Sequence, residues 1–475
     1  MEDVVVRLSK ISMQDFKNVK NGELDFHNRR KNYQASILGL YGQNGSGKTA
    51  LIDALQLLKH ILCGQSAPAD MSDYINVDAE RAVLSYTFDI AVPFGKFEAF
   101  YELNIRKEAD ILEQNLGLNT PREPRTKLVI YNEALSYSFE GRGIKIRKTP
   151  LIDTCTEKVF IPVTKYEHLI GKDKGQAMEL LVAKKIASQT ARSFVFSREL
   201  LEAVRKQQKA RQDDMEFLRH LFLIQSIVIY GNYELFVIST SNIGMISMNA
   251  LPLAFKYEGA DLDGTGQMTL PLETPAVIRE KSLEVVKKVI HDMDIVLEQI
   301  VPGLRISLKD LGTQTLDNGE TGHRIELVSL KNSKEIPLRQ ESDGIKKIIS
   351  ILQLLIVIYN QPSITVAIDE LDSGVFEYLL GEILRIISEK GKGQLIFTSH
   401  NLRPLETLDR GFIAFTTTNP FKRYIRMANL KDNNNLRDFY FRDIVLGEQS
   451  EEVYEATNNA EIALAFREAG EISGP

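Results

Sequence analysis

The sequence predicts an α/β fold with a mixed central sheet flanked by helices, an antiparallel β lobe beside it and a largely helical insertion. Three observations support this expectation. A glycine-rich stretch at 41–50, YGQNGSGKTA, lies between an apolar strand-like run and a helix-like run. Residues 83–107 and 127–148 alternate apolar and polar side chains, which is typical of antiparallel strands. Residues 363–400 run strand, helix, strand, as parallel sheets do.

The period of the apolar residues assigns each segment along the chain to a strand or to a helix. A period of two indicates strands, and a period of 3.6 indicates helices. Polar, glycine-containing residues at 240–272 predict a loop. The longest apolar run, 348–359, predicts a buried core helix that is too short to cross a bilayer. The predicted strands outside the alternating segments are 4–8, 11–13, 23–26, 304–311, 323–330, 364–370, 394–400, 412–418 and 423–430, and the predicted helices are 49–61, 174–235, 282–300, 345–359, 375–390 and 459–469.

These patterns divide the chain into three regions. Residues 1–150 are expected to form an N-terminal lobe that contains the glycine-rich stretch and the antiparallel sheet. Residues 326–475 are expected to form a C-terminal lobe. Between them, residues 151–325 are expected to be mostly helical, because long segments there carry apolar residues on one helix face. This insertion carries no recognisable motif, and it is a candidate for a sensor, a partner surface or a dimer contact.

The composition is that of a soluble globular protein, with 43% hydrophobic and 26% charged residues. The net charge of −6 gives no overall attraction to nucleic acid. Cys63 and Cys155 lie far apart and form neither a metal spacing nor a disulfide framework, which fits a reducing compartment. The N-terminus lacks the layout of a signal peptide. We therefore expect a cytoplasmic protein that has no membrane partner.

The glycine-rich stretch is expected to bind the phosphates of a nucleotide. It matches the spacing G-x-x-x-x-G-K-[ST], with a strand before it and a helix after it. Glycines let the backbone curl so that successive N–H groups point at a phosphate, and the helix adds its positive N-terminal dipole. Lys48 supplies a cation for the outer phosphates, and Thr49 supplies a hydroxyl for Mg²⁺. The predicted nucleotide-binding residues of this P-loop are Gly42, Asn44, Gly45, Ser46, Gly47, Lys48 and Thr49.

A second part of the predicted site lies in the final third of the chain. The apolar run ITVAIDE at 364–370 ends in Asp369 and Glu370. Because ligands of parallel sheets bind at the carboxyl ends of the strands, Asp369 is expected to hold Mg²⁺ and Glu370 to deprotonate the attacking water. The next predicted strand ends in His400, which can reach the γ-phosphate. Lys48, Glu370 and His400 are therefore the predicted catalytic residues.

A third part of the predicted site precedes the core helix. Ser342 and Gly344 lie directly before the helix predicted at 345–359. A serine and a glycine that open a helix can form an anion site, because the free N–H groups and the helix dipole both favour negative charge. The same pair also fits a plain helix cap.

The order of these motifs resembles that of the ABC-type ATPases, in the branch that contains the SMC heads, the DNA-repair heads and the OLD-like ATPases. The stretch ISMQDFKNV at 11–19, ESDGIKK at 341–347 and IDELDSG at 368–374 are similar to the OLD-like group called AAA15. The resemblance covers the two ends of the chain, about 1–150 and 325–430. It implies ATP and Mg²⁺ as cofactors, and a homodimer or higher oligomer.

The resemblance also implies a head-to-tail arrangement of two copies. Ser342 and Gly344 of one copy would close over the ATP that the other copy holds, and residues 371–374 would cross the dimer. Two features depart from the family pattern. The signature is ESDG rather than the longer LSGGQ-like form. The glutamine that joins the two lobes in that family is not identified, and Gln65 and Gln114 are among the alternatives.

The resemblance favours an ATPase subunit of a bacterial phage-defence system that controls a separate effector, either a nuclease or a toxin. Only 75 residues follow His400 in this chain of 475, and they contain no acidic cluster with metal spacing. The alternative is a DNA-binding maintenance ATPase like the repair heads, in which basic stretches at 205–211 and 331–339 would contact phosphates. Stimulation of ATP hydrolysis by DNA would favour this alternative.

Overall fold

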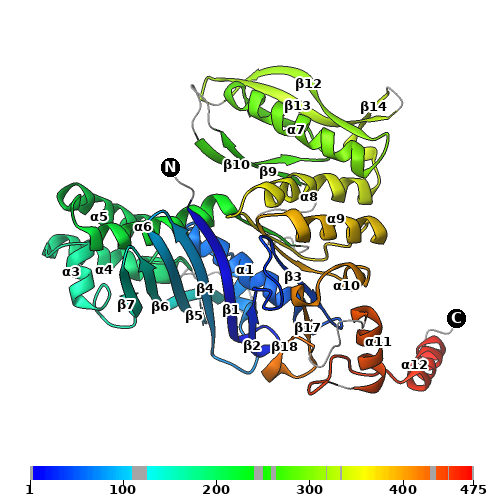
Figure 1. Ribbon diagram of the computed structural model, residues 1–475, viewed down its shortest axis with the longest axis horizontal. Coiled ribbons are helices and arrows are strands. Elements are labelled where there is room, and N and C mark those ends of the chain that lie inside the picture. Colours follow the sequence, from blue (N-terminus) through cyan, green and yellow to red (C-terminus); the bar gives the residue numbers. More distant parts are fainter. Residues whose placement is uncertain are drawn as a thin grey trace, which may run out of the picture.

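The computed structural model describes residues 4–109, 126–239, 250–257, 264–316, 318–331, 334–427, 435–447 and 449–472. Two six-stranded sheets form its centre. A smaller β region with its own helix lies at the top of Figure 1, above two stacked helices that separate it from the central sheets. Two hydrophobic clusters follow this division, one between the central sheets and one that joins the smaller β region to the helices beneath it.

The central sheet consists of short apolar strands. They are β3 (Ser36–Tyr41), β8 (Leu235–Ile238), β15 (Thr365–Ile368), β16 (Gln394–Thr398), β17 (Ile413–Thr416) and β18 (Tyr424–Ile425). Their order is β18-β17-β3-β16-β15-β8, and all neighbours are parallel except β17 and β18. Nearly every residue of these strands is buried, as a sheet covered on both faces requires. The predicted mixed central sheet is confirmed, although β8 at its edge was not predicted.

An antiparallel sheet lies beside the central sheet. Its strands are β1 (Val5–Phe16), β2 (Val19–Asp25), β4 (Arg81–Val92), β5 (Gly95–Ala109), β6 (Thr126–Gly141) and β7 (Ile144–Asp153). Their order is β2-β1-β4-β5-β6-β7. Buried and less buried residues alternate along β4, so one face of the sheet turns inward. The predicted antiparallel lobe is therefore present.

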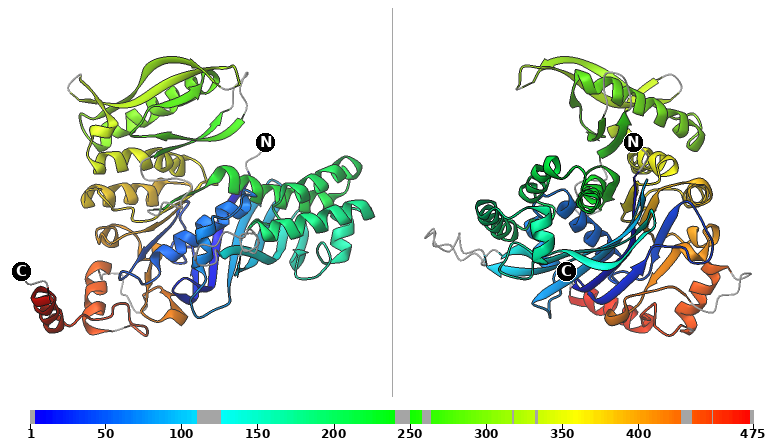
Figure 2. Two further views of the ribbon diagram at one scale, coloured as in Figure 1. Left: turned by 180° about the vertical axis from the view of Figure 1, so that it is seen from behind. Right: turned by 60° about the vertical axis from the view of Figure 1, so that its left-hand side comes forward.

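Helices cover the inward face of the antiparallel sheet. Helix α1 (Lys48–Leu62) is buried along almost its whole length, and it contacts β8 and β15 of the central sheet. On its other side, the hydroxyl of Tyr86 in β4 donates to the carbonyl of Ala54 at 2.7 Å. Four further helices continue this layer along the sheet, as Figure 2 shows. They are α3 (Val163–Leu169), α4 (Lys174–Gln189), α5 (Arg198–Gln208) and α6 (Met215–Ile229).

The second half of the expected helical insertion contains strands as well as a helix. A hairpin and a second small sheet, of order β11-β13-β12 with β14 paired to β13, surround α7 (Glu280–Ile300). Their strands are β9 (Ala250–Tyr257), β10 (Gly264–Pro271), β11 (Ala276–Arg279), β12 (Arg305–Thr315), β13 (Thr321–Lys331) and β14 (Lys334–Pro337). The loop predicted at 240–272 therefore differs from the structure at β9 and β10, and its other parts, 240–249 and 258–263, lie outside the described residues.

The remaining helices belong to the C-terminal third. The predicted core helix is α8 (Asp343–Asn360), which is mostly buried between Lys347 and Ile358, and α9 (Glu377–Lys390) packs beside it. Helices α10 (Pro404–Thr407), α11 (Leu436–Leu446) and α12 (Asn459–Ile472) follow. Helix α12 projects from the body of the molecule in Figure 2. Among the described residues, no helix has both the length and the apolar character needed to cross a bilayer.

Candidate nucleotide-binding site

The glycine-rich stretch forms the turn between β3 and α1. Helix α1 begins at Lys48, with Gly47 as its N-cap. The φ angles of Gly42, Gly45 and Gly47 are 152°, 75° and 96°, a region of backbone conformation that favours glycine. At Gly42 a side chain would also have no room, because a Cβ atom would lie 1.7 Å from the hydroxyl oxygen of Thr416. Both the turn and its packing therefore require glycine.

Lys48 is held inside this turn. Its ammonium group donates to the carbonyl of Gly42 at 2.7 Å and to that of Gln43 at 3.0 Å, and the residue is 7% exposed. Burial lowers the pKa of Lys48, whereas the nearby carboxylates of Asp369 and Glu370 act in the opposite direction. An ammonium group bound to neutral main-chain oxygens can exchange them for phosphate oxygens, which form stronger charge-assisted hydrogen bonds.

Two carboxylates follow β15, and both depend on one threonine. Thr398 at the end of β16 donates its hydroxyl to Asp369 Oδ1 at 2.5 Å and accepts the backbone N–H of Glu370 at 2.8 Å. Asp369 is buried, and Glu370 is exposed with a φ of 48°, which is unusual for a residue other than glycine. Thr398 therefore fixes the positions of both acids. Thr398 carries no distinguishing signal in the sequence, since a threonine inside a strand is common.

His400 is tied to the loop that follows Glu370. Asp372 Oδ2 accepts the backbone N–H of His400 at 3.1 Å and that of Asn401 at 2.9 Å. The side chain of His400 is exposed. Since Asp372 belongs to the segment 371–374, the loops after β15 and β16 are joined directly beside the carboxylates.

A cavity of about 440 Å³ lies where these segments meet. It brings together the P-loop, the two acids after β15 and His400, which come from opposite ends of the chain. Its lining comprises Lys17, Asn18, Asn44, Gly45, Gly47, Lys48, Thr49, Ala50, Asp369, Glu370, Thr398 and His400. Two predicted residues lie behind this lining. Gly42 packs against Thr416, and the buried hydroxyl of Ser46 bonds to the carbonyl of Gln43 and to the hydroxyl of Thr416.

Ser342 and Gly344 do not line this cavity. Ser342 is exposed, and its hydroxyl caps α8 by accepting the N–H of Ile345 at 3.4 Å. Gly344 packs on Gly374, and a Cβ atom at Gly344 would lie 2.3 Å from the carbonyl oxygen of Gly374. The chain therefore does not bring its own Ser342 and Gly344 to its own P-loop.

Two segments that sequence reasoning did not assign to the site support the P-loop. The side-chain amide of Asn18, between β1 and β2, donates to the carbonyl of Gly45. Arg423 Nη2 donates to the carbonyl of Asn18 at 2.7 Å, and the hydroxyl of Tyr424 donates to the carbonyl of Gly47 at 2.9 Å. Asn18 belongs to the FKNV stretch, which carried part of the family resemblance. The two tail residues gave no signal in the sequence.

A buried lysine lies close to the acids. Lys347 in α8 is 2% exposed, and its ammonium group has no hydrogen-bond partner among the residues that the structure describes. Burial lowers the pKa of Lys347 to about 8, and the charges of Asp372, Glu370 and Asp369 partly offset this effect. Lys347 therefore keeps its charge at neutral pH and loses it under mildly alkaline conditions.

The lining fits a nucleoside triphosphate with Mg²⁺. The Thr49 hydroxyl and the Asp369 carboxylate are the hard oxygen ligands that Mg²⁺ prefers. The backbone N–H groups at the start of α1, together with Lys48, match the negative charge of phosphates. Glycine at three positions of the turn leaves the backbone open to close approach. The residues present are therefore those that such a group requires.

Two family models match separate parts of the chain. The first is described as an AAA domain and matches residues 10–227, which contain the P-loop. The second is described as "AAA domain, putative AbiEii toxin, Type IV TA system" and matches residues 273–406, which contain both acids and His400. Both matches support an ATP-binding ATPase domain. No curated protein matches the chain.

Solved structures that are similar to this chain include SMC heads and RecF. The SmcHead bound to the C-winged helix domain of ScpA is 12% identical, with 88% of this chain and 98% of that chain covered and a TM-score of 0.39. The SMC head domain from Thermotoga maritima is 12% identical, with 89% and 100% covered and a TM-score of 0.35. The recombination mediator protein RecF-ATPrS in the RecFOR pathway is 12% identical, with 88% and 98% covered and a TM-score of 0.35. At these TM-scores the likeness decides nothing. The fold class, an α/β P-loop NTPase, follows from the sheet order, the site and the AAA-domain matches.

Proposed function

We propose that this chain is a Mg²⁺-dependent ATPase. The observation that carries the proposal is the single cavity lined by Lys48 and Thr49 of the P-loop together with Asp369, Glu370 and His400. A phosphate-binding turn alone would fit any nucleotide-binding protein. An exposed acid and a histidine at the neighbouring strand ends add the groups that hydrolysis needs.

Five of the lining residues have roles that their environment supports. Lys48 and the N–H groups that open α1 bind the phosphates, and Thr49 and Asp369 hold Mg²⁺, which when bound offsets the charge of the phosphate oxygens. The exposed carboxylate of Glu370 accepts a proton from the attacking water. His400 donates a hydrogen bond to the γ-phosphate.

The substitution Glu370→Gln tests the proposed base. It removes the proton acceptor and leaves the P-loop intact, so we expect ATP binding within about threefold of wild type and a fall in kcat of at least about 100-fold. Phosphate release and titration with a fluorescent ATP analogue measure the two effects. Glu389→Gln on α9, an exposed acid outside the cavity, is the matched control and should retain full activity. Hydrolysis by Glu370→Gln at the wild-type rate would show that another group is the base.

Two copies of the chain close head to tail when ATP binds. Ser342 supports this arrangement, because it opens α8 in an exposed position outside the cavity of its own chain. Exposed aromatic side chains also follow the segment 371–374, with Phe376 at 70% and Tyr378 at 55% exposure. A partner that covered these side chains would bury apolar surface.

Light scattering on the Glu370→Gln background tests closure. With ATP we expect a dimer, and Ser342→Arg should keep the protein monomeric while leaving ATP binding unchanged. Ser66→Arg, at an exposed serine after α1, is the control and should still dimerise. A normal ATP-dependent dimer of the Ser342→Arg variant would refute the trans role of Ser342.

The closed dimer controls a separate nuclease or toxin in cytoplasmic anti-phage defence. The family model matched at 273–406 is described as a putative toxin of a Type IV TA system, which connects this part of the chain with systems that involve a toxin. A pull-down from native lysate should return a second protein, and Lys48→Ala should abolish phage resistance. Recovery of no second protein, together with unchanged resistance after deletion of the gene, would exclude this role. Salt-dependent DNA binding that stimulates hydrolysis would instead favour a DNA-maintenance ATPase.

A further inference from the structure

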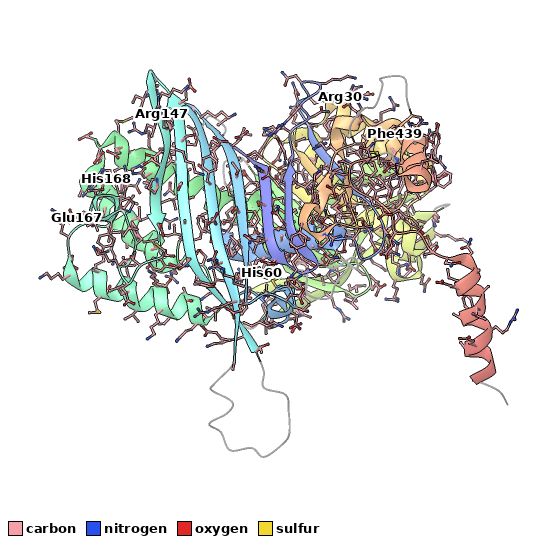
Figure 3. The ribbon with its side chains drawn as sticks, turned by 90° about the horizontal axis from the view of Figure 1, so that it is seen from below. Arg30, His60, Arg147, Glu167, His168 and Phe439 are labelled. Atoms are coloured by element: carbon pink, nitrogen blue, oxygen red, sulfur yellow. The ribbon has the colours of Figure 1, made fainter. Side chains whose placement is uncertain are left out.

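Two histidines and a carboxylate meet between α3 and α6. His168 lies in the last turn of α3, and Glu216 and His220 lie one turn apart on α6. One ligand-capable atom from each of the three side chains lies within 4.8 Å of the other two, and His220 Nε2 lies 4.0 Å from Glu216 Oε1. Figure 3 shows His168 among the helices at the opposite side of the molecule from Phe439. None of the three residues lines the nucleotide cavity.

Each imidazole is oriented by a hydrogen bond at one nitrogen. His168 Nε2 lies 2.8 Å from Asp214 Oδ2, and His220 Nε2 lies 2.7 Å from the hydroxyl oxygen of Tyr137. Carboxylate and hydroxyl partners of this kind fix the orientation of a ring, and they accompany most histidines that bind metals in proteins. Asp214 is itself fixed, because it also caps α6 by accepting the N–H of Phe217 at 3.0 Å.

The other nitrogen of each ring has no partner. Nδ1 of His168 and Nδ1 of His220 are buried and make no hydrogen bond among the residues that the structure describes. His220 is 0% exposed. A buried polar atom without a partner destabilises the folded state, so two of them in one cluster require an explanation. A bound cation supplies one, since an imidazole nitrogen that carries no proton has a lone pair to share.

We propose that His168, Glu216 and His220 form a binding site for a divalent transition-metal ion, with Zn²⁺ as the best match. Two imidazoles and one carboxylate are a ligand set that Zn²⁺ accepts, whereas Mg²⁺ and Ca²⁺ prefer oxygen ligands. With metal–ligand distances of about 2.1 Å, tetrahedral ligand atoms lie about 3.4 Å apart, so the cluster contracts on binding. Three protein ligands leave the fourth position for water. The ion joins α3 to α6.

Lys165 would compete with a bound metal ion for the carboxylate of Glu216. Its ammonium group forms an ion pair with Glu216 Oε1, and its side chain is 20% exposed. A bound metal ion would take the place of this ammonium at the carboxylate, and Lys165 would turn toward solvent. Because the lysine and the metal compete for one oxygen, Lys165→Met should tighten metal binding. We expect a fall in the Kd of about threefold to tenfold.

A titration with Co²⁺ tests the site, because cobalt replaces zinc and gives visible absorption bands in tetrahedral coordination. The full chain, treated with chelator and free of nucleotide, should bind one Co²⁺, and one equivalent of Zn²⁺ should displace it. Glu216→Gln changes an exposed residue and should fold; we expect it to raise the Kd at least about 100-fold, as should His168→Ala. His291→Ala, at an exposed histidine on α7, is the matched control and should leave the Kd unchanged.

Thermal unfolding provides a second measurement. Zn²⁺ should raise the unfolding midpoint of wild type and of His291→Ala, and it should leave that of Glu216→Gln unchanged. Absence of saturable Co²⁺ binding would overturn the proposal. Equal affinity in wild type, Glu216→Gln and His168→Ala would also overturn it, because the ion would then lie elsewhere. Since no nucleotide is present, neither outcome bears on the ATPase proposal.

Discussion

The hydroxyl of Thr398 holds two groups of the nucleotide site, so Thr398→Val should release both. Valine keeps the shape of the side chain but removes the donor to Asp369 and the acceptor for the N–H of Glu370. A hydrogen bond to a charged group contributes about 1.5–3 kcal/mol, and a buried N–H without a partner costs about 1–3 kcal/mol. Because Thr398 lines the cavity, water can replace part of this loss. We expect the free energy of unfolding to fall by about 2–3 kcal/mol.

The same substitution should reduce catalysis more than binding. Displacement of a catalytic group by about 1 Å can reduce the rate about 100-fold, so we expect kcat to fall by about 10- to 100-fold. The Kd for ATP should change by less than about threefold, because the P-loop and Lys48 are untouched. Urea unfolding, phosphate release and ATP-analogue titration measure the three quantities. Thr398→Ser keeps the hydroxyl and should remain close to wild type. If Thr398→Val showed the wild-type kcat and unfolding midpoint, Thr398 would not position the acids.

Three further substitutions test other parts of the site. Lys48→Ala should abolish measurable ATP binding in a fluorescence titration, because the outer phosphates lose their counterion; binding within about tenfold of wild type would contradict this. Gly344→Ala should lower the unfolding free energy by about 1–3 kcal/mol, since its Cβ atom would lie 2.3 Å from the carbonyl oxygen of Gly374, and an unchanged calorimetric midpoint would count against the contact. Between pH 8 and 10 the unfolded chain binds the Lys347 proton that the folded chain has released, so the free energy of unfolding of wild type should rise with pH relative to that of Lys347→Met. Urea unfolding of the two proteins measures this difference, and a difference that stays constant with pH would refute the lowered pKa.

The two halves of the cavity could be predicted because each carries its chemistry in adjacent residues at the end of a strand. The P-loop from Gly42 to Thr49 is contiguous, and its glycines, lysine and hydroxyl are each needed at a fixed offset. Asp369 and Glu370 directly follow a fully buried strand. Parallel pairing of β15 with β16, and of β16 with β3, then places the strand ends side by side. Local chemistry and sheet order together were sufficient.

The residues that support the site from outside its motifs could not be predicted, because they contact their partners only in the folded chain. Arg423 donates to Asn18 across 405 positions of the chain, and Lys347 is distinguished only by the acids that surround it. The strands after β8 were also partly missed. From Lys309 onward β12 is exposed almost throughout, so its side chains show little of the alternation that marks a half-buried strand. Main-chain pairing with β13 defines this strand, and a sequence does not display such pairing.

The contact between Gly344 and Gly374 leaves no side chain between the start of α8 and the segment after Glu370. When two backbones are in direct contact, a shift of one segment shifts the other, since packed atoms are nearly incompressible. In a head-to-tail pair, one backbone would face the partner's triphosphate and the other would face its own. Each turnover would therefore displace backbone at both reaction centres, and hydrolysis at the two sites would be coupled. A tandem protein with one Lys48→Ala half would then retain well under half of the wild-type turnover.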